Sequence, residues 1–335
     1  MVTVVDVAQH AGVSTATVSR VLNGRDPVSP EARSRVLKAV RLLGYRPNSV
    51  AQSLRRGHSR TVALLAGDIE QGIYSTLTKH VQAALEDIGL DLLLFNLGHR
   101  EDRLHHLLAH ASSLGLRGVL IAAPHVLSIG RLRPHLATLA ENGIPLISVG
   151  QRLDRHGIPS LVHDDAAGAA RATRHLLDSG RAPIAFLGRI KESAVGRERY
   201  RGYRRALAER RIESVPELVW ESADRYRAEA GYAATADALD RGVRPRAVLA
   251  SSDELALGGM AAALDRGVRI PDDIAFVGFG GIEWSRYVRP ALSTIGLDLA
   301  AVGAHVAAMF RTLDAGRPIA PLTVVEPALT TRGSG

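Results

Sequence analysis

Positive charge is concentrated at one end of this chain. Residues 1–60 contain ten Lys or Arg side chains against three acids, a net charge of +7, whereas the whole 335-residue chain carries +8. The remaining residues are almost neutral, with 32 basic against 31 acidic side chains. A basic segment attached to a nearly neutral body is the electrostatic footprint of nucleic-acid binding, because it attracts the phosphate backbone.

Helix start and stop signals follow one another within this basic segment. Thr3 and Asp6 have the spacing of a capping box, and Gly12 can adopt the left-handed conformation that ends a helix. Ser14 then caps a second helix, which turns Val18 inward. Two short helices joined by a tight turn that contains Gly predict a helix-turn-helix.

Two more helices are predicted downstream. Ser29-Pro30-Glu31 supplies a cap, a preset φ and an acid near the positive end of the helix dipole, and Gly44 ends this third helix. The fourth stretch, residues 49–55, is too short to be stable as a helix on its own.

The outer face of the second helix carries small side chains and one arginine. Small side chains let the backbone approach the floor of a DNA groove, and Arg20 can make a two-pronged contact to guanine. The residues expected on this face or at its tip are Thr15, Ala16, Ser19, Arg20 and Asn23.

The segments GVSTATVSRVLNG and LGYRPNSVAQSL resemble the DNA-binding headpiece and hinge of the LacI/GalR family of bacterial transcription regulators. The resemblance implies that the second helix reads the major groove. It also implies that two hinge helices meet in the minor groove, with Leu54 wedged into a base step. The DNA-binding residues that it implies are Ser14, Thr15, Ala16, Thr17, Ser19, Arg20, Asn23, Tyr45, Asn48, Ala51, Leu54 and Arg55.

The same resemblance implies the partners of the chain. One headpiece reads too few bases for specificity, and paired half-sites mirror a two-fold dimer. We therefore expect double-stranded DNA with a palindromic operator, a homodimer held by its core with further assembly left open, and a small-molecule effector.

The pattern of the chain changes after residue 60. Short apolar runs such as 61–66, 118–123 and 183–188 alternate with helix-like stretches, which is typical of parallel sheets covered on both faces. Two series with similar layouts predict two doubly wound subdomains. The resemblance implies a bilobed core like that of periplasmic sugar-binding proteins, with three chain crossings and a ligand cleft between the lobes.

The predicted fold class is α/β, with an N-terminal all-α helix-turn-helix headpiece and a bilobed periplasmic-binding-protein-like core of two doubly wound parallel-sheet subdomains. The predicted bounds are 1–46 for the headpiece, 47–59 for the hinge helix and linker, and 60–335 for the effector-binding and dimerisation core, with lobe 1 at about 60–161 and 291–321 and lobe 2 at about 162–290 and 322–335.

The composition and the first residues of the chain indicate the cellular compartment that we expect. The chain has no Cys, which suits a reducing cytoplasm, and Asp6, Gln9 and His10 interrupt any apolar signal-peptide run. No stretch approaches the ~20 apolar residues of a membrane span. We expect a cytoplasmic protein with no membrane partner; a solute-binding protein for transport would need a signal peptide and would have no use for residues 1–60.

Motifs for catalysis, cofactors and metals fail at specific positions. A dinucleotide fingerprint around Gly278 would need Gly where Glu283 stands, and neither a P-loop nor a GxSxG turn is present. His106 and His110 have i, i+4 spacing, but a solvated helix face explains them better than a metal site. Asp164-Asp165 suits a helix cap better than a catalytic pair. We therefore expect no enzyme activity, no cofactor and no metal.

The resemblance also implies an effector site. The chain departs from the family pattern at two positions. Ser252 stands where the family usually has Asn, and Gly280 stands where it usually has Asp. Asn and Asp are the usual partners of sugar hydroxyls, so these replacements put an ordinary sugar effector in doubt. The implied effector residues are Ile73, Tyr74, Arg152, Ser193, Arg199, Tyr226, Ser252 and Gly280.

Basic residues gather around the same presumed cleft. If two of them faced it with no acid opposite, an anionic effector such as a sugar phosphate or an organic acid would pair with them. The alternatives are solvated arginines and a neutral sugar effector. The basic residues concerned are Arg152, Arg189, Lys191, Arg197 and Arg199.

Overall fold

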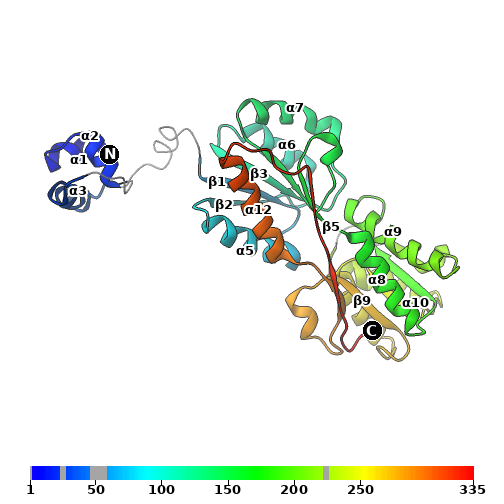
Figure 1. Ribbon diagram of the computed structural model, residues 1–335. Coiled ribbons are helices and arrows are strands. Elements are labelled where there is room, and N and C mark those ends of the chain that lie inside the picture. Colours follow the sequence, from blue (N-terminus) through cyan, green and yellow to red (C-terminus); the bar gives the residue numbers. More distant parts are fainter. Residues whose placement is uncertain (1, 23–27, 46–58, 222–225) are drawn as a thin grey trace. The chain divides into compact units, whose positions relative to one another are not determined.

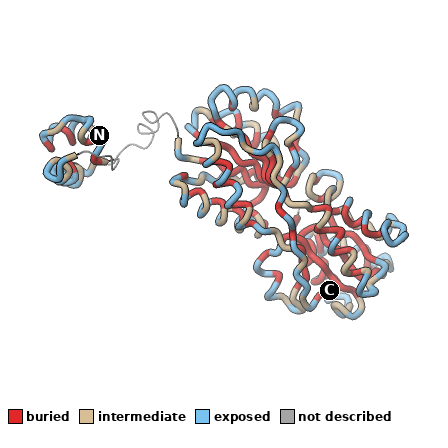
Figure 2. The backbone as a smooth tube through the Cα atoms, in the orientation of Figure 1, coloured by how far each residue is buried: buried red, intermediate tan, exposed pale blue. Residues whose placement is uncertain are grey.

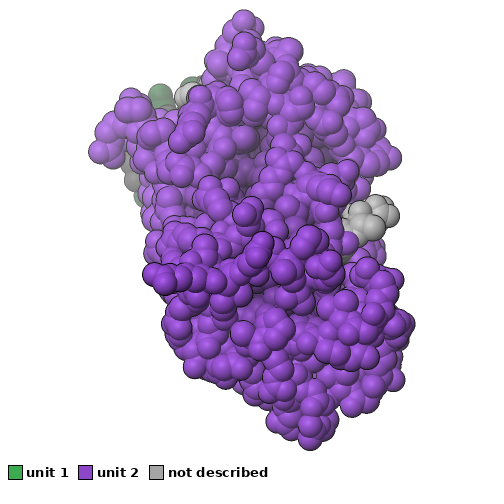
Figure 3. All heavy atoms as spheres, turned by 90° about the vertical axis from the view of Figure 1, so that its right-hand side faces the viewer, with its two compact units in different colours: residues 1–59 green, residues 60–335 purple. Residues whose placement is uncertain are grey.

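The computed structural model describes residues 2–22, 28–45, 59–221 and 226–335. The chain divides into two compact units, residues 1–59 and 60–335, which Figure 3 colours separately. Across the described ranges, no helix combines the length and the apolar character needed to cross a membrane.

The first unit is all-α in its described part (Figure 1), with a small apolar core between its helices. The Thr3 and Asp6 side chains form the predicted capping box, in which the Thr3 N–H donates to Asp6 at 2.7 Å. Gly12 has φ 60° and ends the first helix as predicted. The helices are α1 (Val4–Ala11), α2 (Thr15–Leu22) and α3 (Pro30–Leu43). The buried core residues are Val7, Ala8, Ala11, Val18, Val21, Val36 and Ala39.

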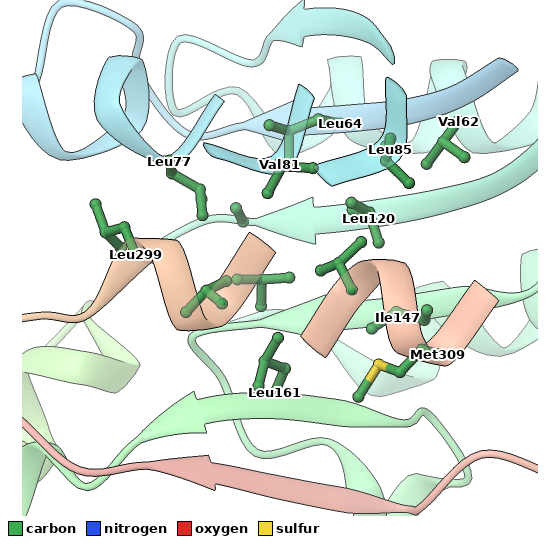
Figure 4. Packing of buried hydrophobic residues seen from close by; sticks show 14 of the residues in the cluster. Val62, Leu64, Leu77, Val81, Leu85, Leu120, Ile147, Leu161, Leu299 and Met309 are labelled. Atoms are coloured by element: carbon green, nitrogen blue, oxygen red, sulfur yellow. The ribbon is translucent and has the colours of Figure 1, made fainter. Parts of the chain in front are cut away.

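The second unit contains two lobes, each a parallel or mostly parallel sheet between helices. In lobe 1 the sheet order is β11-β5-β4-β3-β1-β2 and every pairing is parallel. One sheet face packs on α5 and α12 (Figure 4), and the other packs on α6 and α7. The strands are β1 (Thr61–Ala66), β2 (Asp91–Asn96), β3 (Leu116–Ala122), β4 (Leu146–Val149), β5 (Ser160–His163) and β11 (Leu322–Val325). The helices are α5 (Gly72–Glu86), α6 (Glu101–His110), α7 (Ile129–Glu141) and α12 (Leu299–Asp314).

Lobe 2 repeats this layout with the sheet order β12-β10-β9-β8-β6-β7. Its short last strand, β12, runs antiparallel to β10, and the other pairings are parallel. Helices α8 and α9 cover one face, and α10 and α11 cover the other. The strands are β6 (Ile184–Gly188), β7 (Val219–Glu221), β8 (Ala247–Ala250), β9 (Ala275–Gly280), β10 (Ser293–Gly296) and β12 (Ala328–Thr330). The helices are α8 (Asp165–Asp178), α9 (Ala194–Glu209), α10 (Ala228–Asp240) and α11 (Asp253–Leu264).

Burial follows this architecture, since the buried residues trace the strands at the centre of each lobe (Figure 2). Strands buried on both faces explain the unbroken apolar runs of the sequence, and the predicted α/β class with two doubly wound subdomains is confirmed.

The chain crosses between the lobes after β5, after β10 and after β11. The predicted lobe bounds are wrong near the last two crossings. Residues 293–296 pair with β9 of lobe 2, and residues 322–325 pair with β5 of lobe 1. An isolated strand carries no sign of which sheet edge it will join, because either edge offers the same unpaired backbone groups.

Candidate functional site

The α2 helix presents its predicted outer face to solvent. Val18 and Val21 are buried in the headpiece core, which leaves Thr15, Ala16 and Arg20 exposed on the other side. The exposed face therefore carries small residues around one long cation, as the sequence predicted.

Other predicted DNA-binding residues have structural contacts. The Ser14 hydroxyl accepts a hydrogen bond from the Thr17 N–H at 3.1 Å and lies 2.9 Å from the Thr17 hydroxyl, so both residues fix the start of α2. Ser19 is half-buried. Tyr45 packs against the headpiece core, and its N–H donates to the Val40 carbonyl at 3.0 Å. The predicted residues Asn23, Asn48, Ala51, Leu54 and Arg55 lie outside the described residues.

A cavity of about 100 Å³ lies between the two lobes of the core. It is lined by the start of α5 and by the carboxyl ends of β3, β4 and β9, which is where parallel sheets usually bind ligands. Most of its walls are apolar. Six of the predicted effector residues line it: Ile73, Tyr74, Arg199, Tyr226, Ser252 and Gly280.

The other two predicted effector residues do not line this cavity. Ser193 is fully buried behind it, where its hydroxyl caps α9 and lies 2.7 Å from the Tyr226 hydroxyl. Ser193 therefore positions Tyr226. Arg152 borders a separate groove, and its side chain is 56% exposed and 3.5 Å from Asp154.

Three groups of the described core contact the guanidinium of Arg199. Its Nε donates to Asp165 at 2.8 Å, its Nη1 donates to the Ser251 carbonyl at 2.5 Å, and its guanidinium lies 3.9 Å from the centre of the Phe279 ring. Gly202 allows this pairing, because a Cβ there would lie 2.1 Å from the Ala166 carbonyl and hold α9 away from α8. The charge of Arg199 is thus matched by a buried carboxylate.

The other basic residues near the cleft contact acids or carbonyls, although the buried Nε and Nη1 atoms of Arg189 have no hydrogen-bond partner in the described part of the chain. Arg189 donates to Glu192 at 2.6 Å, and Lys191 lies 3.3 Å from Glu221. The Arg197 side chain is exposed and donates to the Ile190 carbonyl at 3.2 Å. Among the described residues that line the cavity, Arg199 is the one arginine, and an acid faces it. The arrangement that would favour an anionic effector, two arginines with no acid opposite, is therefore not found.

The aspartates of the predicted pair have separate roles. Asp164 caps α8 by accepting a hydrogen bond from the Ala167 N–H at 2.8 Å, as the cap interpretation expects. Asp165 pairs with Arg199 instead. Asp253 is fully buried and accepts from the Ile282 N–H and the Thr294 hydroxyl, so it ties α11 to the loop after β9.

Glu254 lines the cavity and was not predicted from the sequence. It lies in the first turn of α11, and its Oε1 accepts a hydrogen bond from the Gly72 N–H across the cleft at 3.0 Å. Burial raises the pKa of the Glu254 carboxyl. The sequence shows Glu254 as an ordinary acid at a helix start, so its position at the cleft depends on the packing of the two lobes.

Further contacts join the lobes on both sides of the cavity. Arg227 of lobe 2 donates to Asp68 of lobe 1 at 3.3 Å and also pairs with Glu70. On the other side, the Ala194 N–H donates to the Pro124 carbonyl at 2.9 Å. The lobes are thus in direct contact on both sides of the cavity.

The histidines of α6 do not form a metal centre in the described structure. His110 Nδ1 lies 2.8 Å from the His106 carbonyl oxygen, and the two rings pack with centroids 4.4 Å apart. In residues 2–22, 28–45, 59–221 and 226–335, no group of three His, Cys, Asp or Glu side chains could hold a metal ion.

Comparison with known proteins links both parts of the chain to one family. Residues 3–48 match the family model of bacterial regulatory proteins of the lacI family, and residues 173–335 match that of the periplasmic binding protein-like domain. Catabolite control protein A of Priestia megaterium is 31% identical over 304 residues, which cover 90% of each chain. The transcriptional regulator GalR of Escherichia coli is 30% identical, covering 100% of this chain and 96% of GalR.

A solved structure extends the similarity to the whole fold. The lac repressor dimer bound to operator and the anti-inducer ONPF aligns with a TM-score of 0.89 and 26% identity, covering 99% of this chain and 98% of that chain.

Proposed function

Because the chain belongs to the LacI family of bacterial DNA-binding transcription regulators, we propose that it is a sequence-specific repressor whose operator affinity is controlled by a small molecule bound between its core lobes. The observation that carries this proposal is the pairing of two sites in one chain. The exposed face of α2 lies on a strongly basic headpiece, and the core encloses a cavity lined from both lobes. An effector in that cavity can shift an equilibrium between lobe arrangements if it contacts one of them better.

In the proposed complex, α2 enters the major groove of a palindromic operator. Arg20 is exposed and is the long cation of the reading face, so we assign to it a two-pronged contact with guanine. Thr15 and Ala16 approach the neighbouring bases. By resemblance, Leu54 of each hinge enters the minor groove between the half-sites. Since the target is chromosomal DNA, the proposed place of action is the bacterial cytoplasm.

A palindrome requires two headpieces, and the core offers surfaces for a homodimer. Strand β2 is one of the two edge strands of the lobe 1 sheet, and Leu93 and Leu94 on it are each 38% exposed. In lobe 2, Trp284 is 71% exposed and packs its ring edge-on against Tyr287. Apolar side chains on an edge strand and large exposed aromatic rings are typical of surfaces that a partner covers. We propose that a second copy of the chain covers both.

Selection of bound sequences from random DNA, followed by footprinting with the full-length chain, tests this function. The expected result is a single palindrome protected by a dimer, with sedimentation giving the mass of two chains. Random DNA that shows no enriched sequence, or a monomer that protects both half-sites, would refute the proposal.

A further inference from the structure

The ionic groups around the cavity do not balance. Arg199 is matched by Asp165 at 2.8 Å, so this pair adds no net charge. Glu254 also lines the cavity, and among the described residues no cation forms an ion pair with it. Its carboxylate has the Gly72 N–H at 3.0 Å as a neutral partner. In its ionised form, Glu254 would therefore face the cavity without a cationic partner among the described residues.

The edge of the cleft beside Glu254 is negative as well. Asp68 and Glu70 of lobe 1 both pair with the guanidinium of Arg227, and Asp68 also lies 3.7 Å from His99 Nε2. Asp68 is only 4% exposed. Burial raises the pKa of the Tyr74 hydroxyl. Tyr226, Asp68 and Glu254 act in the same direction, and the positive charge of Arg199 acts against them.

The remaining titratable groups of the wall add no positive charge. Burial lowers the pKa of His163, so its ring is neutral at pH 7. The phenol of Tyr226 is neutral too, because burial raises its pKa. The rest of the lining is largely apolar, with Ile73, Leu77, Val149, Phe279 and Leu299 among its residues.

We propose that the effector carries a protonated amine that pairs with Glu254, on a compact and largely apolar skeleton, and that the cleft excludes anions. This inference rests on the proposed function, in which the cavity is the effector site. A carboxylate without a counter-charge in an apolar cavity is unfavourable, and an ammonium group placed beside it removes that penalty. An anion would meet the same carboxylate, and Arg199 could receive it only by giving up Asp165.

The position of Glu254 also links recognition to the lobes. Glu254 belongs to lobe 2, whereas Asp68, Glu70 and the Gly72 N–H belong to lobe 1. A cation between them is attracted by both lobes when they are together and by only one when they separate. The ammonium ligand therefore stabilises the closed arrangement that the structure shows.

Three probes with one skeleton test the proposal: cyclohexylamine, cyclohexanol and cyclohexanecarboxylate. Each is titrated against the full-length dimer by thermal shift and by calorimetry at pH 7 and fixed ionic strength. We expect cyclohexylamine to bind about tenfold or more tightly than cyclohexanol, since hydrogen bonds to charged groups are the stronger class. We expect the carboxylate to bind more weakly than the alcohol.

Two variants separate the role of Glu254 from a general charge effect. Glu254→Gln keeps the size of the side chain and an acceptor for the Gly72 N–H, and it should remove the preference for the amine. Glu229→Gln removes an exposed acid from the first turn of the neighbouring helix α10 and should keep that preference. Each shift is measured against the melting temperature of the same variant without probe.

The outcomes are decisive for the inference. Equal binding of the three probes, tighter binding of the carboxylate, absence of any response to the amine, or an amine preference that survives in Glu254→Gln overturns it. If the amine proposal fails but the palindrome is still protected in footprinting, the proposed function is retained and only the proposed ligand class is wrong. If operator binding fails as well, the proposed function itself is wrong.

Discussion

The headpiece and the cleft are opposite kinds of site. The proposed reading face of α2 is exposed, basic and built from residues within one run, 15–20. The cleft lies between the two lobes, contains an acid with no cationic partner among the described residues, and is lined by residues from Gln71 to Val302. A surface that binds a polyanion can be built from adjacent residues with water around it. A cavity that selects a small molecule needs groups from several elements and the exclusion of water, so each charge in it needs a partner.

Salt should separate the two sites by the largest margin. Operator affinity should fall about 10³- to 10⁵-fold between 50 and 200 mM salt, because log K falls by about 0.9 for each phosphate neutralised. Amine binding in the enclosed cleft should change much less, since buried charges are weakly screened. Filter binding and calorimetry across the same salt series measure both. An operator affinity that does not change with salt would contradict the assignment of the basic headpiece as the DNA-binding surface.

Breaking the buried ion pair should affect the core strongly. Arg199→Ala leaves Asp165 buried and unpaired, and it should destabilise the core by about 3–5 kcal/mol in chemical denaturation. It should also abolish the effector response. Arg152→Ala is the control, because the Arg152 side chain is 56% exposed and its ion pair with Asp154 contributes about 1 kcal/mol or less. The double apolar replacement Arg199→Met with Asp165→Leu should recover stability without recovering the response. Equal losses for the two single variants would contradict the contrast between buried and exposed arginines.

Arg20→Ala should affect the headpiece site alone. It should weaken operator binding by about 1–3 kcal/mol and relax the preference at one G·C pair in each half-site. Denaturation of the core should be unchanged, because Arg20 lies in the other compact unit. Binding measured on operators changed one base pair at a time is the readout. A uniform loss across all sequences would make Arg20 a phosphate contact.

The smallest expected effect concerns pH and Glu254. Its folded-state pKa is raised by burial above the ordinary value of 4.5, so the folded core prefers the protonated acid. This contribution to stability is fully present below pH 4.5 and is lost as pH rises through the folded-state pKa. Glu254→Gln should therefore stabilise the ligand-free core at pH 7 and lose that advantage at pH 4. Denaturation at both values checks this, and a variant less stable than the parent at pH 7 would contradict the buried, unmatched carboxylate.

How much was predictable differs between the two sites. The capping box of Thr3 and Asp6 and the stop at Gly12 were predicted from spacing and are present in the structure. The apolar runs predicted two doubly wound sheets, which the structure confirms. At the cleft, resemblance selected six residues that line the cavity, yet Arg152 lies outside it and Ser193 behind it. Glu254 was missed, because nothing in its local sequence distinguishes it from a solvated acid at a helix start.

The sequence by itself therefore determined the elements, the charge of the headpiece and the face of α2, because these depend on neighbours within one or two helical turns. Only the tertiary structure decided which sheet received β10 and β11, that Asp165 neutralises Arg199, and that Glu254 meets Gly72 across the cleft. The physical reason is distance along the chain. Glu254 and Gly72 are 182 residues apart in the sequence. Local composition and periodicity do not indicate which distant residue will become the ion-pair or hydrogen-bond partner.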